Sequence, residues 1–330
     1  MKSKLEHPVL IVSSDVDSHT TKPVQDALQK RGFDSVVYST DGVVSMRDVF
    51  VVSIDQVDTN ISLNDKDISP KNIAAAWYRK PNTSSVVEDK TDIAKNVYMR
   101  LEVNTMHDNI WYLYPDNLWL NPPKKLKTTD SKLEQLAIAQ SLGFKIPHTI
   151  AGNNWETITQ ISDENEGIVA KMVRGVIADE NILKAMYTTP LSSDLLKQLT
   201  KSANPFPGIY QENIYKYREW RVTVVGDNVF SASIYTDDDA KDDWRKLQNT
   251  KSVRFKDELL PDHIQERCIS YVRKLGLLYG AIDIIEQDKD DFVFLECNPN
   301  GQYQWLEAQL GLPISDAIAQ KLADIALQNM

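Results

Sequence analysis

The sequence predicts a protein of mixed helix and sheet, with an α/β part at its N-terminus and a sheet-rich part at its C-terminus. Strand and helix patterns alternate over the first 120 residues, as they do in α/β proteins. A proline-containing break follows at residues 121–125, and strand patterns dominate beyond residue 208. The length of 330 residues suits two domains or three closely packed subdomains, at about 100–200 residues per domain.

Composition excludes several classes of protein. The chain is 42% hydrophobic and 25% charged, which is ordinary for a globular protein and excludes extended disorder. Its net charge of −10 argues against non-specific binding to nucleic acid, which depends on neutralising phosphates. The chain also lacks the run of roughly 18 apolar residues that a membrane helix needs. We therefore expect neither nucleic acid nor a membrane as a partner.

Cysteine usage and the first residues indicate a compartment. The two cysteines, Cys268 and Cys297, form neither a disulfide framework nor a metal-ligand spacing. The apolar run near the N-terminus spans five residues, so it predicts a strand rather than a signal peptide. We therefore expect the protein in a reducing cytoplasm.

The N-terminal part predicts an open, largely parallel sheet with helices on its faces. Apolar and β-branched runs predict its strands at residues 7–14, 34–39, 49–54 and 73–78. Periodic segments predict its helices at residues 22–31 and 89–108. The first turn lacks the Gly-x-Gly-x-x-Gly pattern of dinucleotide-binding folds, which makes a nicotinamide or flavin enzyme a poor interpretation.

After the break, a helix capped by Thr129 or Asp130 is predicted to reach about Leu142, with Gly143 ending it. Strands are predicted after residue 149 and at 167–173 and 208–214, followed by a hairpin of 220–225 and 229–235. Helices are predicted at 262–275 and 314–328.

A second hairpin, formed by residues 280–286 and 292–298, carries acidic residues inside apolar runs. If its turn holds an even number of residues, Asp283 lies opposite Phe294. Strand alternation then places Asp283, Glu296 and Asn298 on one face, with the two carboxylates as diagonal neighbours. Cys297 alternates with them and is expected to point into the core. One turn residue more or fewer would break this arrangement.

Two carboxylates and an amide oxygen on one face predict a site for a hard cation. Mg²⁺ prefers such oxygen ligands, particularly where it also binds substrate phosphates. The alternative is a pair of solvated residues at a sheet edge, although a solvated charge is unusual inside an apolar run.

Seven short segments stand out along the chain, in this order: WYRKP at 77–81, KLEQL at 132–136, Lys171 at the end of a strand, QENI at 211–214, EWRVTVVG at 219–226, DWR at 243–245 and ECNPNGQ at 296–302. In this order they resemble motifs of the ATP-grasp ligases and, more narrowly, of the graspetide synthetases, which close rings in microviridin-type ribosomal peptides. One departure is the segment MVRG at 172–175, which lacks a glycine-rich phosphate loop.

This resemblance implies an α+β ATP-grasp architecture in three parts. Residues 1–122 would form an N-terminal α/β domain that precedes the grasp region, 123–206 a small central subdomain, and 207–330 a C-terminal sheet subdomain. The resemblance also implies ATP and Mg²⁺ as cofactors and a ribosomal precursor peptide as partner. Homodimers are common among the proteins it resembles.

The implied reaction is a ligation. The γ-phosphate of ATP would pass to an Asp or Glu side chain of the precursor peptide, releasing ADP. A Thr or Ser hydroxyl would then attack the acyl phosphate and close a macrolactone, or a Lys amine would close a macrolactam. The resemblance favours the ester only because it is commoner in that family.

The resemblance also assigns nucleotide-binding residues. Lys132 and Lys171 would neutralise phosphates, as compact cationic side chains do, unless they are ordinary surface lysines. The segment Gln211 to Ile214 would meet adenine, and Glu212 within it would meet the ribose or be a hairpin-edge acid. Glu219 completes the nucleotide set.

The remaining assignments concern phosphate transfer and the acceptor. Arg221 and Arg245 would stabilise the transferring phosphate, because an arginine binds phosphate bidentately; the alternative for both is a structural ion pair. Asp283, Glu296 and Asn298 would hold magnesium. Arg79 would face the acceptor site, or else cap a helix or form an ion pair.

Two other functions remain open at this point. One is an ATP-grasp ligase that adds an amino acid to a peptide or protein. The other is a module that binds nucleotide without turnover, which the retention of all three metal ligands disfavours.

Overall fold

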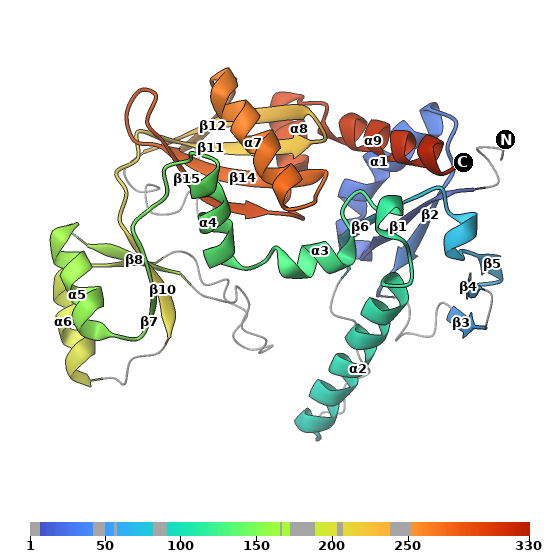
Figure 1. The fold of residues 1–330 in the computed structure, drawn as a ribbon, viewed down its shortest axis with the longest axis horizontal. Helices are drawn as coiled ribbons and strands as arrows, with labels where there is room; N and C mark the ends of the chain where they lie inside the picture. Colours follow the sequence, from blue (N-terminus) through green and yellow to red (C-terminus); the bar gives the residue numbers. More distant parts are fainter. Residues whose placement is uncertain are drawn as a thin grey trace.

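A computed structural model describes residues 7–41, 50–55, 58–81, 91–165, 167–171, 189–202, 207–237 and 252–330. Within these residues it holds one parallel and three antiparallel sheets, with helices packed on and between them (Figure 1). Short 3₁₀ turns lie at Asp15–Asp17, Pro70–Asn72 and Asp116–Leu118. No helix in these ranges is both long and apolar enough to cross a membrane.

The N-terminal part is built on a three-stranded parallel sheet. Strand β1 (Val9–Ser13) is central and pairs with β2 (Ser35–Ser39) and β6 (Ala75–Lys80). All five residues of β1 are buried, which explains its unbroken apolar sequence. Helix α1 (Ser18–Lys30) packs against this sheet. The predicted parallel arrangement is therefore confirmed for these three strands.

The predicted strand at 49–54 does not belong to that sheet. It is β3 (Phe50–Ile54), which pairs antiparallel with β4 (Thr59–Leu63), and β4 pairs with the short β5 (Lys66–Asp67). Only two of the five residues of β4 are apolar, so the strand carries little apolar signal and the sequence does not reveal it as the partner of β3.

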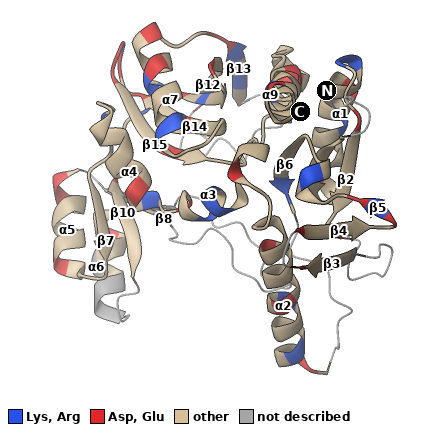
Figure 2. Cartoon of the chain, turned by 45° about the vertical axis from the view of Figure 1, so that its right-hand side comes forward, with Lys and Arg blue, Asp and Glu red and all other residues tan. Residues whose placement is uncertain are grey.

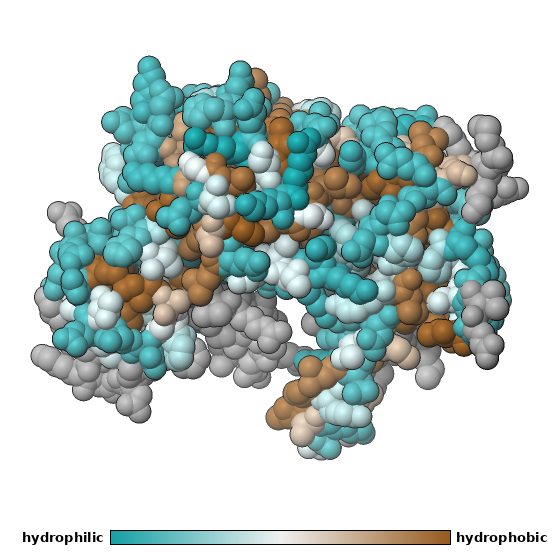
Figure 3. All heavy atoms as spheres, viewed as in Figure 1, coloured by the Kyte–Doolittle hydropathy of each residue, from teal (hydrophilic) through white to brown (hydrophobic). Residues whose placement is uncertain are grey.

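Helix α2 (Ile93–Trp111) projects from the rest of the molecule (Figure 1). Its last turn is buried through Ile110 and Trp111, whereas Ile93, Val97 and Leu101 are exposed. The apolar surface along the projecting part is visible in Figure 3. The predicted beginning of this helix at residue 89 lies outside the described residues.

A four-stranded antiparallel sheet, ordered β7-β10-β8-β9, forms the central part. Its strands are β7 (Thr149–Gly152), β8 (Ile168–Lys171), β9 (Thr189–Leu191) and β10 (Gly208–Glu212). Helices α5 (Trp155–Glu164) and α6 (Ser193–Ser202) cover one face through a cluster that includes Ile158, Ile168 and Tyr210 (Figure 1).

Two helices connect the N-terminal and central parts: α3 (Pro123–Thr128) and α4 (Lys132–Ser141). Ser131 caps α4, accepting a hydrogen bond from the Glu134 backbone, so the predicted cap at Thr129 or Asp130 was wrong. Thr129 instead ends α3, and its hydroxyl donates to the Lys125 carbonyl. Thr129, predicted as a cap at the beginning of α4, therefore ends the preceding helix α3 instead.

The C-terminal part is a five-stranded antiparallel sheet in the order β13-β12-β11-β14-β15. Its strands are β11 (Arg218–Val225), β12 (Asn228–Thr236), β13 (Val253–Asp257), β14 (Tyr279–Glu286) and β15 (Phe292–Asn298), and its helices are α7 (Asp262–Lys274), α8 (Gln304–Leu310) and α9 (Ile314–Asn329). One face carries Trp220, Val222, Ile282 and Phe294, which pack on α4 and α7 in a common core. The opposite face is the one relevant to function.

The two ends of the chain share a second core. Helix α9 lies beside α1, and residues of both helices join one buried cluster with β1 (Figure 1). Arg31 donates to Asp316 across this contact at 2.7 Å. Figure 2 shows basic and acidic residues interspersed over the N-terminal and C-terminal parts alike.

Candidate functional site

The site is organised by the hairpin of β14 and β15. Glu286 pairs with Phe292, so the turn holds residues 287–291, an odd number. That register alone would put Asp283 opposite Leu295 and turn Glu296 to the other face. The register shifts by one residue between Ile284 and Asp283, and Asp283 pairs directly with Glu296.

This shift is a β-bulge with Leu295 as the extra residue. Our assumption of an even turn was wrong, and the two carboxylates are direct neighbours rather than diagonal ones. The expected common face nevertheless exists, because the odd turn and the bulge cancel. Asn298 pairs with Ala281 and so shares the face of Asp283 and Glu296. Cys297 alternates with them and is buried in the opposite core, as expected.

Arg221 lies on β11 directly across from Asp283. Its Nη1 donates to Asp283 Oδ1 at 2.9 Å, and its Nη2 donates to the Gln302 carbonyl at 3.1 Å. Arg221 is only 8% exposed. Burial by itself would lower the pKa of Arg221, but the Asp283 carboxylate and its hydrogen bond raise that pKa overall. The guanidinium therefore stays charged.

Lys132, the first residue of α4, approaches the same carboxylates. Its Nζ lies 3.5 Å from Glu296 Oε2. The Glu296 side chain is 30% exposed and that of Asp283 is 22% exposed, so both remain accessible to a ligand. Arg221, Asp283, Glu296 and Lys132 thus form a row in which two neighbouring carboxylates lie between two cations, drawn from three strands and one helix.

Glu219 shares the face of Arg221 because it stands two residues earlier on β11. Its carboxylate accepts a hydrogen bond from Lys216 Nζ at 3.0 Å, and the residue is largely buried. The structure therefore brings residues from the predicted nucleotide, metal and catalytic groups onto one sheet face.

The central sheet carries two further predicted residues, Lys171 and Gln211. Tyr210 and Ile168 face α5 and α6, so alternation places Lys171 and Gln211 on the other face. Gln211 is buried, and its Nε2 donates to Thr149 Oγ1 at 2.9 Å.

The other hinge residues, Glu212 and Ile214, lie differently from Gln211. The Glu212 side chain lies on the opposite face of the strand from Gln211. Its carboxylate accepts a hydrogen bond from the His148 backbone N–H at 3.1 Å. The predicted strand 208–214 ends at Glu212. Ile214 packs against Leu295, Ile285 and Val293, which connects the hinge segment to the bulge.

Arg79, expected to face the acceptor or form an ion pair, is fully buried in an ion pair. Its Nε donates to Asp17 at 2.9 Å. Its Nη1 donates to the carbonyls of Asn300 and Gly301, and its Nη2 donates to Gln302. The structure supports the ion-pair alternative for Arg79 and gives no support to substrate contact, because protein groups occupy this guanidinium.

The loop held by Arg79 is a feature that sequence reasoning missed. Its Gln302 carbonyl accepts from Arg221, and its Gly301 carbonyl accepts from the Tyr279 hydroxyl at 2.6 Å. A Cβ on Gly301 would lie 2.4 Å from the Ala281 Cβ and 2.6 Å from Arg221 Nη2, so only glycine fits. The signal was available in the NPNG run, which is typical of a tight turn.

The remaining predictions fall outside the described residues. Arg245 is one of these, and the segment 172–188, which follows Lys171, is another. Their assignments stay predictions.

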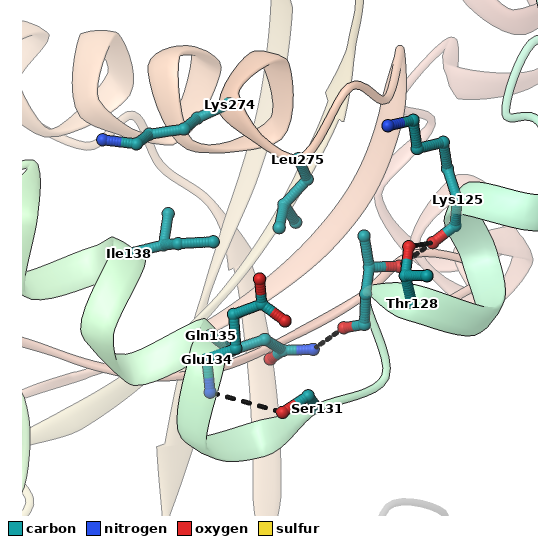
Figure 4. A pocket seen from close by; sticks show the side chains of 9 residues that line it. Lys125, Thr128, Ser131, Glu134, Gln135, Ile138, Lys274 and Leu275 are labelled. Carbon is teal, nitrogen blue, oxygen red and sulfur yellow. Dashed lines mark hydrogen bonds between the residues drawn. The ribbon is translucent and has the colours of Figure 1, made fainter.

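Two cavities flank the N-terminal half of α4. One, of about 150 Å³, lies between α3, α4 and α7 and is lined by Lys125, Glu134, Gln135 and Lys274 (Figure 4). The other, of about 280 Å³, is lined by Lys132 together with Ala151 and Ile209 of the central sheet. Neither is lined by Asp283 or Glu296.

The donor set fits magnesium bound together with phosphates. Among the described residues, no group of three or more His, Cys, Asp or Glu side chains could hold a metal on its own. Asp283 and Glu296 supply two carboxylates and Asn298 one amide oxygen, on an accessible face between two cations. Mg²⁺ commonly takes one or two carboxylates and completes its shell with phosphates and water.

A central antiparallel sheet and a C-terminal antiparallel sheet, preceded by a parallel α/β part and joined by a short hinge, are the ATP-grasp architecture; this chain has that fold. No family model matches the chain.

Two solved structures match along nearly the full length. One is the macrocyclase MdnC of Microcystis aeruginosa, bound with precursor peptide MdnA; it is 29% identical, with 96% of this chain and 99% of MdnC covered and a TM-score of 0.80. The other is a RiPP-associated ATP-grasp ligase of Chryseobacterium gregarium, in complex with ADP and a leader and core peptide; it is 26% identical, with 96% and 97% covered and a TM-score of 0.84.

A curated relative is the tetrahydromethanopterin:alpha-L-glutamate ligase of Methanococcus maripaludis. It is 26% identical over 258 residues, which cover 74% of this chain and 82% of the relative. The resemblance inferred from short motifs is thus confirmed as one to ATP-grasp ligases, among them ligases crystallised with precursor peptides.

Proposed function

We propose that this protein is an ATP-dependent carboxylate ligase that closes rings in a ribosomal precursor peptide. The observation that carries the proposal is the row of Arg221, Asp283, Glu296 and Lys132 within an ATP-grasp fold, in which two neighbouring carboxylates lie between two cations. The full-length likeness to two peptide-bound relatives supports a peptide as substrate.

In this proposal each group acts by position and charge. Asp283, Glu296 and Asn298 hold magnesium, which supplies neutralisation of the phosphates and orientation of the reacting oxygen. Lys132 and Lys171 bind the phosphates, and the hinge from Gln211 to Ile214 meets the base, with Glu212 and Glu219 completing the nucleotide site. Arg221 retains its charge and stabilises the transferring phosphate, a task that Arg245 shares.

The chemistry then needs no covalent enzyme intermediate. A carboxylate oxygen of a peptide Asp or Glu attacks the γ-phosphorus, the bond to ADP breaks, and an acyl phosphate forms. A Thr or Ser hydroxyl of the same peptide attacks the acyl carbon, phosphate leaves, and the hydroxyl proton passes to solvent. The net change in the peptide is loss of one water per ring. The proposal includes the ester as product and a homodimer as the assembly.

The test is an intact-mass spectrum of the small peptide encoded beside this gene, after incubation with the protein, ATP and Mg²⁺. Loss of one water per ring together with ADP is the expected result. Methanolysis of the product opens an ester and leaves a Lys amide intact, so it decides between the two ring types. Formation of AMP and pyrophosphate would exclude the acyl-phosphate route.

A second candidate is a ligase that adds an amino acid, which the likeness to the glutamate ligase favours. It predicts a gain of one residue mass in place of a loss of water. A module that only binds nucleotide predicts no change in mass and no ATP consumption, with or without peptide.

A further inference from the structure

We propose that Gln135 is a positioning residue whose side-chain amide holds β15 in register beyond the bulge and so places Glu296 and Asn298 against Asp283. The inference rests on the proposed function, because it concerns the magnesium and nucleotide site. It is carried by a set of contacts on the side of β15 that does not face β14.

Gln135 is 4% exposed and uses both ends of its amide. Its Oε1 accepts from the Cys297 backbone N–H at 2.9 Å, and its Nε2 donates to the Cys297 carbonyl at 2.9 Å. Nε2 also donates its second hydrogen to the Thr129 carbonyl, at an N–O distance of 2.8 Å (Figure 4). The side chain thus pairs with one residue of β15 as a neighbouring strand would.

This pairing falls at a place where the sheet provides no strand. β15 is the last strand in the sheet order, with β14 as its neighbour. On its outer edge, the Lys145 carbonyl accepts from the Phe294 N–H at 2.9 Å. Gln135 makes the hydrogen bonds to Cys297 on the same edge. The bulged residue Leu295 therefore lies between two residues, Phe294 and Cys297, that are each held by a hydrogen bond from outside the sheet.

These two contacts matter because the position of the bulge determines which residues of β15 pair with which residues of β14. If the extra residue moved one position along β15, Glu296 would turn away from Asp283. Hydrogen bonds to both backbone groups of Cys297 oppose that slip. Cys297 stands between Glu296 and Asn298, so holding its backbone also fixes the backbone positions from which those two side chains extend.

The same helix also places a cation beside Glu296. Lys132 stands three residues before Gln135 on α4, hence on the same side of that helix. Its Nζ is 3.5 Å from Glu296 Oε2. Gln135 therefore locks α4 to β15 at the point where Lys132 meets Glu296, and it acts on the metal site through these residues without touching a ligand.

The experiment measures ADP affinity by calorimetry, with Mg²⁺ and with EDTA, for the full chain and for Gln135→Met. Methionine keeps the length of the side chain and removes its hydrogen bonds. In the wild type, Mg²⁺ raises ADP affinity. In Gln135→Met this increment is expected to fall on the order of tenfold to a hundredfold, while ADP affinity in EDTA stays unchanged.

Two variants of the same helix serve as controls. Gln140→Met makes the same chemical change at an exposed position and should keep the full Mg²⁺ increment. Leu136→Ala removes a buried side chain next to Gln135 and should lower stability in urea while keeping the increment. If Leu136→Ala loses the increment as Gln135→Met does, the effect is general destabilisation and the inference fails.

The remaining outcomes are also decisive. A Gln135→Met protein with the wild-type increment overturns the inference. If that variant does not fold, Gln135→Glu, which keeps the acceptor and loses the donors, must show a reduced increment, and a wild-type value again overturns the inference. If Mg²⁺ does not change the ADP affinity of the wild-type protein, the proposed function is contradicted as well. This result separates a failure of the proposed function from a failure of the inference about Gln135 alone.

Discussion

Two arginine–carboxylate pairs lie on the same two strands, β11 and β14, three residues apart, and face opposite sides of the sheet. Arg218 with Glu286 lies on the side packed by α7, and Arg221 with Asp283 lies on the side of the candidate site. They share strands, register and residue types, so differences between them reflect their surroundings.

The Arg218 pair is closed. Glu286 accepts from Arg218 Nε at 2.5 Å and from Trp220 Nε1 at 2.8 Å. Arg218 also donates to Glu258 at 2.6 Å and to the Tyr235 hydroxyl at 2.7 Å. The Glu286 side chain is only 3% exposed, and protein donors match its charge, as a buried carboxylate requires.

The Arg221 pair is open towards a ligand. Asp283 accepts from Arg221 through Oδ1 and stays 22% exposed beside the exposed Glu296. Asp283 and Glu296 lie side by side and repel each other; Arg221 and Lys132 offset part of this repulsion, and a cation bound between the carboxylates would offset more of it. The comparison teaches that the accessibility of the carboxylates, rather than the residue types or the register, distinguishes the pair in the candidate site from the pair on the packed side.

The largest expected effect is on turnover, from Glu296→Ala. If Glu296 is a magnesium ligand as proposed, its removal should lower the proposed ATP-dependent ring closure by about 10²–10³, the range seen for loss of one transition-state contact. Stability should hold, because removing one of two adjacent carboxylates relieves repulsion. Ring closure by mass spectrometry and urea unfolding measure the two quantities. An active Glu296→Ala protein would remove the metal assignment.

Arg221→Lys comes next. Lysine keeps the charge but loses the fork that bonds Asp283 and the Gln302 carbonyl together, so turnover should fall about 10²-fold. Single-turnover ATP cleavage with saturating peptide measures this. Retained wild-type turnover would make the pair structural and erase the contrast with Arg218.

Arg218→Met tests the other side of the sheet. It leaves Glu286 buried and without its ion-pair partner, so the free energy of unfolding should fall by about 3–5 kcal/mol. Turnover per folded molecule should stay near wild type. Glu286→Gln added to this variant should recover part of the stability, and a turnover loss as large as that of Arg221→Lys would contradict the distinction.

The smallest expected effect is on the pH dependence of stability, and it concerns the buried contact between His107 and Tyr38 in the N-terminal core. His107 is buried with its Nε2 2.9 Å from the Tyr38 hydroxyl, and burial lowers its pKa, an effect that Asp108 partly opposes. The unfolded chain therefore binds a proton at higher pH than the folded one. Stability should fall as pH drops below about 6.5, the ordinary histidine value. Urea unfolding of His107→Gln should show a shallower fall than the wild type.

Local pattern predicted much of this fold. The runs that became β1, β14 and β15 are apolar and β-branched, and the helices α7 and α9 match their predictions within two residues at each end. These elements were predictable because their own residues decide them. The strand β3 was assigned to the wrong sheet because sheet membership depends on distant partners.

The site shows the same division. Asp283, Glu296 and Asn298 share a face as expected, yet through a bulge at Leu295 that alternation alone does not reveal. The residues on either side of the bulge are hydrogen-bonded by Lys145 and Gln135, about 150 residues away in sequence. Arg79 illustrates the remaining limit, because its burial depends on Asp17 and on the loop at residues 300–302.

The packing of α9 on α1 has a consequence for how the protein is made. Ile318, Leu322 and Ile325 of α9 complete the core that Val24 and Leu28 of α1 form with β1. During synthesis the first sheet, complete at Lys80, therefore leaves the ribosome with one apolar face uncovered, and it stays so until α9 begins at Ile314, more than two hundred residues later. Because such distant contacts close late, the N-terminal part is expected to be the last to acquire its full stability, although it is the first to be translated.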